Sequence, residues 1–404
     1  MAKSDPVQLP LSKVRVGHTV KLPLAWKDHP FWINRIKIEE PAQIEMIRGL
    51  GVEFVYLLAG ELPPDIMDDE PEVDEVVTEV AKPASIDQQL ETRKAIRLSQ
   101  KRFLNSVNGS RTVFGKLLSD PEGSLELATG LVEELAGHLD EGIKPYLALV
   151  SSGESVVGVT QHSISVMVLA MMIGREMGLD REQMCHIGLG ALFHDIGKLK
   201  VPESIRNNPG ELTTPERNFL KAHPNFGHEM LSRSGLFPEP VLHIVRHHHE
   251  YFDGSGYPDA LAGKDIPLLT QIVSLVNDFD HLLVREDVRS PQVALGFIFK
   301  KRAGKHDMEL IKLLVRVLGI YPPGTLVQLS DGSVGKVMLT SDKVKQPQVW
   351  SCTVEGEEPC LRFLRQEKVQ VLDVVAADEL APQAAKVLQA YANISFYFIS
   401  PVTA

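Results

Sequence analysis

Residues 162–198 read HSISVMVLAMMIGREMGLDREQMCHIGLGALFHDIGK, and this stretch decides the fold. Its first part, residues 162–177, is almost entirely apolar, which predicts a helix buried on all sides inside a bundle. Asp180 and Gln183 have the spacing of a capping pair, so we expect a second helix to begin there and to run to about Asp195. The stretch therefore predicts a mainly α protein built around buried helices.

The rest of the chain divides into segments that differ in composition and in the spacing of their apolar residues. We expect a small α/β domain of unknown role over residues 1–60, an acidic linker over 61–85, a helical region over 86–318 and a β-rich extension over 319–404. In the first segment, alternating apolar residues and a short buried strand at 54–58 indicate strands, with a helix expected near residues 40–50. In the last segment, Asp331-Gly332 between apolar runs predicts a hairpin, followed by one more helix near residues 378–392.

Smaller patterns make local predictions. Six apolar residues at helical spacing predict one buried stripe on a helix, namely Leu90, Ile96, Leu98, Phe103, Leu104 and Val107. Gly188 and Gly190 lie inside the second helix and indicate close packing rather than a phosphate loop, because no strand precedes them. His18 and His29 are isolated in the first segment and are expected at the surface.

The charge of the chain is concentrated in the linker. The 404 residues include 42 Lys and Arg against 53 Asp and Glu, a formal net charge of −11. Residues 61–85 hold nine carboxylates, one lysine, four prolines and no aromatic residue, and so carry −8 of that charge. This composition is typical of a solvated linker. The alternative is an acidic segment that attracts a basic partner protein. The acidity excludes a general binder of long nucleic acids, but not of a small anion at a local positive centre.

Composition and cysteine content restrict the class and location of the protein. Hydrophobic residues make up 44% and charged residues 24% of the chain, which excludes global disorder. Cys185, Cys352 and Cys360 are too few and too scattered for a disulfide framework or a Cys-rich zinc site. The longest apolar run, residues 166–173, is far shorter than the roughly 20 residues of a membrane helix, and the first residues lack the apolar core of a signal peptide. We therefore expect a cytoplasmic protein without a membrane span.

The histidines are clustered in the helical region. Of 14 histidines, eight fall between His186 and His249. Imidazoles and carboxylates are ligands that iron, zinc and manganese accept, and Gly197 can end the second helix so that the preceding His-Asp pair turns toward one site. An Asp can bridge two metals, which together hold a hydroxide and clamp a phosphodiester for in-line attack. The cluster therefore predicts a dinuclear centre from His162, His194, Asp195, His223 and the run His247, His248 and His249.

Each of these groups also has a plainer interpretation. A lone buried histidine such as His162 is commonly a hydrogen-bonded core residue, and a His-Asp pair alone has little specificity. The triple histidine at 247–249 resembles part of a purification tag, yet it lies inside the chain. The combination of several such groups in one bundle favours the metal site, and His186, His228 and His243 are expected to lie outside it.

Several short motifs follow one another across the helical region. They are HDIGK at 194–198, VP at 201–202, PGELT at 209–213, His223, Gly227, HHE at 248–250, DGSGYP at 253–258 and IP at 266–267. Their order and spacing closely resemble those of an HD-GYP domain, over roughly residues 150–310. Residues 1–60 and YPPG at 321–324 also resemble the extensions of one HD-GYP subfamily, whose N-terminal domain has no settled function. The resemblance implies the helical bundle of the HD superfamily.

The resemblance also implies an activity: hydrolysis of the bacterial second messenger cyclic di-GMP to pGpG or GMP by a metal-bridged hydroxide. It implies two divalent ions, Fe or Mn, with Asp195 as the bridge and His162, His194, His223, His248, His249 and Asn277 as the other ligands. It further implies Asp195 and Lys198 as catalytic residues, and Lys198, Gly256, Tyr257, Arg285 and Arg289 as substrate contacts. The implied partners are cyclic di-GMP and signalling proteins such as diguanylate cyclase domains.

Lys198 and the glycine-rich loop have simpler interpretations as well. Lys198 lies one helical turn after Asp195, where its ammonium can neutralise a phosphoryl oxygen. A lysine at a helix end also interacts favourably with the helix dipole, and this alone would explain it. Residues 253–258, taken without the resemblance, indicate only a turn.

The chain departs from the HD-GYP pattern at two metal positions. Trinuclear members carry a Glu four residues before the first ligand histidine, where this chain has Gly158, so we expect two metals rather than three. A ligand Asp is replaced by the neutral Asn277, which should weaken metal binding. Asp278 would take that position only if the alignment shifted by one residue, which breaks the match at Phe279-Asp280, and a helix turns its side chain about 100° away.

A third departure concerns the substrate. A phosphate-binding Arg expected after Asp280 aligns with Glu286, although Arg285 is adjacent and Arg289 matches a second basic position. We therefore expect a cyclic di-GMP phosphodiesterase whose activity is reduced by Asn277 and Glu286. The alternative is a catalytically weakened domain that acts as a cyclic di-GMP receptor or protein-interaction module. A nucleotide phosphohydrolase of the wider HD superfamily is a third hypothesis, against which Tyr257 in its glycine loop argues.

Overall fold

A computed structural model describes residues 7–10, 13–21, 35–38, 47, 54–59, 86–140, 144–151, 158–206, 208, 210–285, 288 and 290–399. The chain divides into two compact units, Met1–Glu79 and Val80–Ala404. Several predictions fall outside the described residues: the linker at 61–85, the helix near residues 40–50 apart from Ile47, and the positions of His29, Glu286 and Arg289.

The first unit contains a small antiparallel sheet. Its strands are β1 (Val7–Pro10), β4 (Phe54–Ala59), β2 (Thr19–Lys21) and β3 (Arg35–Lys37), in that order across the sheet. The strand expected at 54–58 is therefore confirmed as β4. The prediction that His18 lies at the surface is wrong, because His18 is only 5% exposed and its Nδ1 accepts a hydrogen bond from the Arg15 backbone at 3.3 Å.

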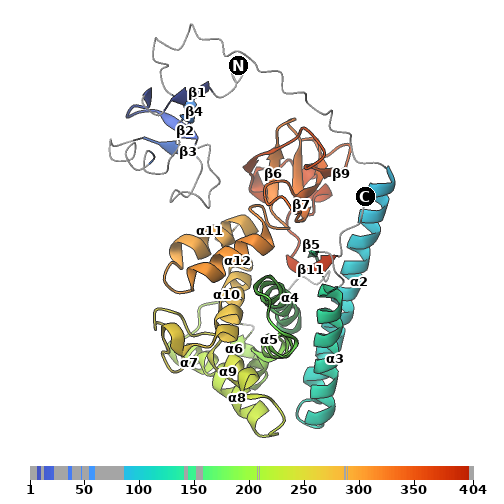
Figure 1. The fold of residues 1–404 in the computed structure, drawn as a ribbon, viewed down its shortest axis with the longest axis vertical. Coiled ribbons are helices and arrows are strands. Elements are labelled where there is room, and N and C mark those ends of the chain that lie inside the picture. Colours follow the sequence, from blue (N-terminus) through green and yellow to red (C-terminus); the bar gives the residue numbers. More distant parts are fainter. Residues whose placement is uncertain are drawn as a thin grey trace. The chain divides into compact units, whose positions relative to one another are not determined.

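The second unit is a helical bundle with a β-sheet at one end (Figure 1). Its helices are α2 (Ile86–Lys116), α3 (Pro121–Leu139), α4 (Val159–Met177), α5 (Arg181–Phe193), η4 (Ile196–Lys200), α6 (Glu203–Arg206), α7 (Thr214–Lys221), α8 (His223–Ser232), α9 (Glu239–His247), η5 (Gly263–Asp265), α10 (Leu268–Leu283), α11 (Pro291–Lys301) and α12 (Met308–Leu318). The mainly α fold class is confirmed. Among the described helices, none combines the length and the apolar character that crossing a membrane requires.

The centre of the bundle is the pair α4 and α5, as the opening stretch of sequence predicts. Every residue of α4 from Gln161 to Gly174 is buried, and α4 packs against α5 and α10. The start of α5 has the expected capping box: Gln183 donates its backbone N–H to the Asp180 carboxylate at 2.8 Å, and its side-chain oxygen accepts from the Asp180 backbone at 3.1 Å. These two helices therefore follow directly from local sequence.

Glycines allow helices to approach closely at two levels of the bundle. A Cβ added at Gly188 would collide with Val132, and one added at Gly190 would collide with Ile244, so both positions are for close packing as predicted. Gly197 behaves differently from our expectation. It does not end the second helix, because α5 ends at Phe193 and Gly197 lies inside η4, where a Cβ would collide with the carbonyl of His223.

The stripe predicted for α2 is only partly correct. Phe103 and Val107 are buried, and the Phe103 ring lies 6.5 Å from that of Tyr397, but Leu90 and Leu98 are about half exposed. The helix lies at the edge of the bundle beside α3 (Figure 1), so only the part of its stripe that meets other elements is covered.

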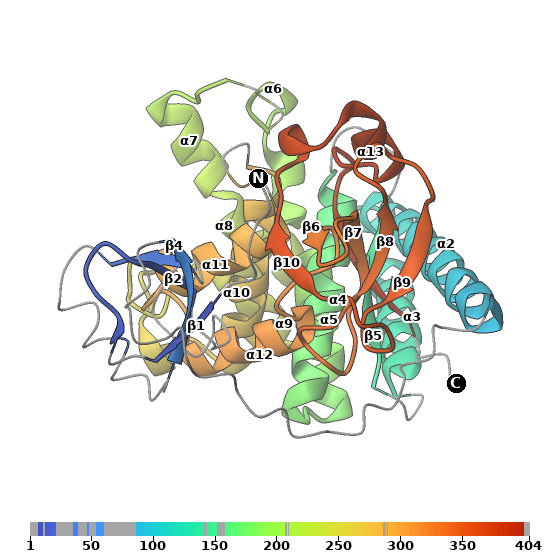
Figure 2. The same cartoon turned by 90° about the horizontal axis from the view of Figure 1, so that it is seen from above.

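The sheet of the second unit combines distant parts of the chain. Its strands are β5 (Tyr146–Val150), β6 (Leu326–Leu329), β7 (Val334–Leu339), β8 (Gln348–Cys352), β9 (Cys360–Phe363), β10 (Val371–Val374) and β11 (Ser395–Ile399). Figure 2 labels β5 to β10, and Figure 1 labels β11 next to β5. The order is β10-β6-β7-β5-β11, with β8 paired to β7 and β9 paired to β8. The predicted hairpin is confirmed as β6 and β7, and the predicted helix is a shorter one, α13 (Pro382–Val387), after the turn η6 (Ala377–Glu379).

Strand β5 corrects the expectation of a continuously helical region. It lies between α3 and α4 in sequence but pairs with β11 along its whole length and meets β7 at Ala148 and Leu339. The sheet therefore contains strands from both sides of residue 318. The domain boundary that we expect there stays a prediction. The three cysteines are free, as expected from their number.

Candidate metal centre

The candidate ligands come from separate helices and converge on one buried site. His162 lies in the first turn of α4, His194 and Asp195 lie between α5 and η4, His223 begins α8, His248 and His249 follow α9, and Asn277 lies in α10. The change from α5 to the tighter η4 lets two consecutive residues, His194 and Asp195, face the same site, with Nε2 and Oδ2 3.6 Å apart. The site is thus assembled from helix ends, where side chains can point along the helix axis.

One set of ligand atoms, the first donor group, comes from His162, His194 and Asp195. His162 Nε2 lies 3.1 Å from His194 Nε2 and 3.5 Å from Asp195 Oδ2. Asn277 Oδ1 lies 3.0 Å from His162 Nε2. The structure therefore brings the amide of Asn277 to the place where a fourth donor of this group would be.

The second donor group comes from Asp195, His223, His248 and His249. His223 Nε2 lies 3.1 Å from Asp195 Oδ1 and 3.2 Å from His248 Nε2. His248 Nε2 is 3.7 Å from the same carboxylate oxygen, and His249 Nε2 is buried without a hydrogen-bond partner among the described residues. Asp195 directs Oδ2 to the first group and Oδ1 to the second, which is the arrangement of a bridging carboxylate.

The other ring nitrogen of four histidines is occupied by an acceptor. His194 Nδ1 donates to the Ala191 carbonyl at 2.7 Å, His223 Nδ1 to Leu220 at 2.8 Å and His248 Nδ1 to Val245 at 2.9 Å. His162 Nδ1 donates to Asp280 Oδ2 at 2.6 Å. Because Nδ1 carries the proton in each neutral ring, each Nε2 presents a lone pair to the centre.

The electrostatics of the site favour the same protonation states. Burial lowers the pKa of His194 to about 3 and holds the pKa values of His248 and His249 well below the usual range. Burial alone would raise the pKa of Asp195, but the positive charge of Lys198 is the largest opposing influence, and the pKa of Asp195 lies well below its usual value. Neutral imidazoles and an ionised carboxylate are the forms that bind metal ions.

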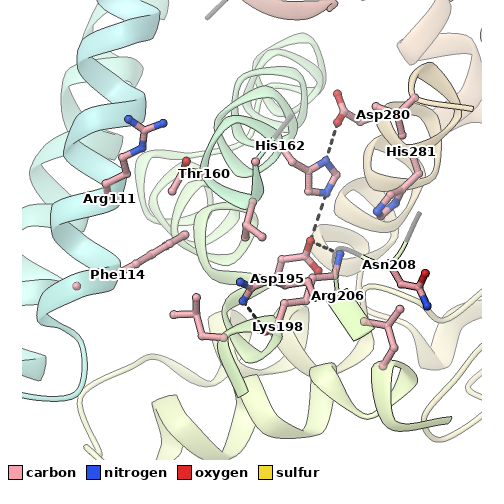
Figure 3. A pocket seen from close by; sticks show the side chains of 16 residues that line it. Arg111, Phe114, Thr160, His162, Asp195, Lys198, Arg206, Asn208, Asp280 and His281 are labelled. Atoms are coloured by element: carbon pink, nitrogen blue, oxygen red, sulfur yellow. Dashed lines mark hydrogen bonds and ion pairs between the residues drawn. The ribbon is translucent and has the colours of Figure 1, made fainter. Parts of the chain in front are cut away.

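A large pocket opens above the first donor group. It has a volume of about 1030 Å³, and His162, Asp195 and Lys198 lie in its wall (Figure 3). The Lys198 ammonium lies 2.6 Å from Asp195 Oδ2. Lys198 thus pairs with the carboxylate that both donor groups share and also lines the pocket.

The sequence alone did not identify three pocket residues that carry a guanidinium or an imidazole. Arg111 on α2, Arg206 on α6 and His281 on α10 all line the pocket (Figure 3). The His281 ring lies 4.7 Å from that of His162, centroid to centroid, and burial keeps its pKa well below the usual range. His281 follows Asn277 by one helical turn, and that spacing could have identified it. Arg111 has no comparable signal in the local sequence.

The remaining predicted substrate contacts have different positions. The Tyr257 ring stacks on His249 with centroids 4.7 Å apart, and Gly256 allows that loop to lie against the backbone of Glu250. Arg285, in contrast, is exposed, and its guanidinium lies 5.2 Å from the Phe297 ring, so the structure does not place it in the wall of the pocket.

Neighbouring acids and histidines have other partners. Asp278 pairs with Arg302 at 3.1 Å and His306 at 3.0 Å, on the side of α10 away from the centre. His243 Nδ1 lies 3.0 Å from Thr270 Oγ1, and neither donor group includes His186, His228 or His243. Gly158 is the N-cap of α4 and lines the pocket without a side chain.

Comparison with known families matches two regions of the chain. Residues 149–310 match the HD domain family, and residues 7–128 match the family described as a domain of unknown function, DUF3391. The HD match contains both donor groups, whereas the second match extends from β1 through α2 into α3.

Three curated relatives illustrate the similarity. A cyclic di-GMP phosphodiesterase of Pseudomonas aeruginosa is 29% identical over 82% of this chain and 81% of its own length. The cyclic di-GMP phosphodiesterase response regulator RpfG of Xanthomonas campestris is 36% identical over 37% of this chain and 40% of its own length. The 3'3'-cGAMP-specific phosphodiesterase 2 of Vibrio cholerae is 33% identical over 34% of this chain and 27% of its own length. The chain therefore carries an HD domain over residues 149–310 and a DUF3391 region over residues 7–128.

Proposed function

We propose that this protein is a metal-dependent phosphodiesterase that hydrolyses cyclic di-GMP to pGpG or GMP. The observation that carries the proposal is the pair of donor groups that share Asp195 below a pocket of about 1030 Å³. The names of the Pseudomonas and Xanthomonas relatives support this substrate.

The donor atoms fit a pair of cations. Four Nε2 lone pairs and a carboxylate converge, with His162 Nε2 and His194 Nε2 3.1 Å apart and His223 Nε2 and His248 Nε2 3.2 Å apart. Such acceptor–acceptor contacts are unfavourable in a buried site unless a cation lies between them. The first donor group with Asn277 would hold one ion and the second donor group the other.

The residues suggest Fe or Mn as the metals. The donor set contains imidazoles, one shared carboxylate and an amide, with no cysteine. Imidazole suits iron and zinc, whereas carboxylate and carbonyl oxygens suit manganese. Two divalent ions held there would activate water and polarise the phosphodiester. With Gly158 at the N-cap of α4, that position offers no side chain to a third ion.

The chain's own residues would bind and orient the substrate. Lys198 holds Asp195 in place through its 2.6 Å contact and presents a positive charge to a non-bridging phosphoryl oxygen. Tyr257 fixes His249 by stacking, and burial raises the pKa of Tyr257, so its phenol remains a hydrogen-bond donor at neutral pH. Lys198 would therefore act from the wall of the pocket, whereas Tyr257 would act on the second donor group through His249.

Anaerobic purification followed by metal analysis and product analysis tests this function. We expect about two Fe or Mn ions per chain and conversion of cyclic di-GMP to pGpG or GMP. The substrate series should include 3'3'-cGAMP, because one relative is named for it. Binding of cyclic di-GMP without cleavage by the metal-loaded protein would contradict hydrolysis and favour the receptor. Partner proteins such as diguanylate cyclase domains stay a prediction.

A further inference from the structure

The pocket above the metal centre is completed by a helix from outside the HD match. Arg111, Phe114 and Gly115 of α2 line the pocket, although the HD family match begins at residue 149. Figure 3 shows Arg111 and Phe114 on one wall, facing His162, Asp280 and His281 across the space. The region matched to the N-terminal family therefore contributes side chains to the active site.

The wall formed by α2 is held firmly against the bundle. The Phe114 ring packs on Phe193, which directly precedes the ligand His194, with centroids 5.8 Å apart. Ser124 of α3 donates its hydroxyl to the Val113 carbonyl at 2.8 Å. The backbone that carries Arg111 is thus fixed relative to the metal ligands, so its guanidinium can serve as a defined binding group.

The two walls differ in charge. On the side of the metal ligands, the pocket is lined by Asp195, Asp280 and Lys198, whose ammonium is paired with Asp195. On the α2 wall the lining residues are Arg111, Phe114 and Gly115, with no carboxylate among them. Arg206, the other arginine that lines the pocket, donates from its guanidinium to the Lys198 carbonyl at 3.2 Å and so lies on the side of the metal ligands. The arginine on the α2 wall is Arg111.

A cyclic dinucleotide has a second phosphate that needs such a partner. The reacting phosphodiester would lie at the metal centre, while the other phosphate lies across the macrocycle. A pocket of about 1030 Å³ is large enough for a ligand of this size rather than for one phosphate alone. Arginine suits the task because its planar guanidinium can donate two parallel hydrogen bonds to phosphate.

We propose that Arg111 binds the second, non-reacting phosphate of the cyclic dinucleotide. This assignment rests on the proposed function and deepens it, because α2 then determines which phosphodiesters the centre accepts. A small phosphodiester such as bis(p-nitrophenyl) phosphate has no second phosphate and makes no use of Arg111. The selection of substrates by size thereby depends on α2, a helix that precedes the HD match in the sequence.

The test compares R111A, R111K and the control K101A, which removes an exposed cation from the same helix away from the pocket. We expect R111A to raise KM for cyclic di-GMP about tenfold with little change in kcat, and R111K to recover part of the loss. KM for bis(p-nitrophenyl) phosphate should rise much less, and bound metal per chain should match the wild-type protein.

An unchanged KM for cyclic di-GMP in R111A would overturn the assignment. An equal rise in KM for both substrates, or loss of metal, would also overturn it, because Arg111 would then act through the centre or the fold. If the wild-type protein itself fails to cleave cyclic di-GMP, the proposed function is overturned instead. The two failures are therefore distinguishable.

Discussion

The two donor groups share Asp195 but differ in their remaining ligands. The second donor group adds the imidazoles of His223, His248 and His249 to the shared carboxylate. The first donor group adds only His162 and His194, with the amide of Asn277 as the remaining donor. The comparison predicts that one centre combines a stronger and a weaker metal position.

The physical reason to expect an inequality is donor strength. Both positions divide the single charge of Asp195, and an amide oxygen is a weaker donor to these metals than the third imidazole of the second donor group. An ion next to Asn277 is therefore held mainly by two imidazoles. We expect the first donor group to lose its ion first under a chelator.

Removing the shared carboxylate should have the largest effect. In D195N both groups lose the charge of the shared carboxylate, and the five imidazoles remain without a compensating anion. We expect bound metal to fall to about a tenth of the wild-type amount or less and turnover to fall by about 10³-fold or more. Metal analysis and cyclic di-GMP turnover would check this, with D140N as a control at an exposed aspartate. Metal retained in D195N would show that Asp195 is not the bridge.

Removing one imidazole from each group should sharpen the comparison. H162A weakens only the first donor group, so about one tightly held ion should remain per chain. H223A weakens the second group and leaves only the weaker position intact, so less than about one ion should remain. Metal content after gel filtration measures the difference. Equal losses in the two variants would mean that the groups are equally strong.

Replacing Lys198 should separate chemistry from metal binding. K198M removes the positive charge beside the pocket but leaves every ligand atom of both groups in place. We expect kcat to fall roughly 10- to 100-fold with metal content unchanged. If metal content falls in parallel with kcat, Lys198 acts by holding Asp195 rather than by binding the phosphoryl group.

Part of this centre could be predicted from sequence because its signals are local. The capping pair Asp180 and Gln183 and the apolar run before it position α4 and α5. The HD-GYP motifs then predict the ligands, and the structure brings those side chains together in two groups. Asn277 Oδ1 lies 3.0 Å from His162 Nε2, while Asp278 faces other partners.

The rest depends on contacts that no local pattern encodes. The strand β5 is five residues in a helical region, and its partner β11 begins at Ser395, so neither segment alone indicates the pairing. Arg111 reaches the pocket because α2 packs against α3 and α4, with Phe114 on Phe193 at the end of α5. The sequence draws attention to Gly197. The need for glycine there comes from close contact with the His223 carbonyl, which lies on another helix and is not visible in the local sequence.

Titration of the metal-free protein with Mn²⁺ tests the inequality of the two groups most directly. We predict two classes of site whose dissociation constants differ by about tenfold or more, because one position has the amide of Asn277 where the other has a third imidazole. The variant N277D should tighten the weaker class by about tenfold or more, whereas N218D, the same change at an exposed position of α7, should leave both unchanged. A single class of site in the wild-type protein, or an N277D titration identical to it, would contradict this account.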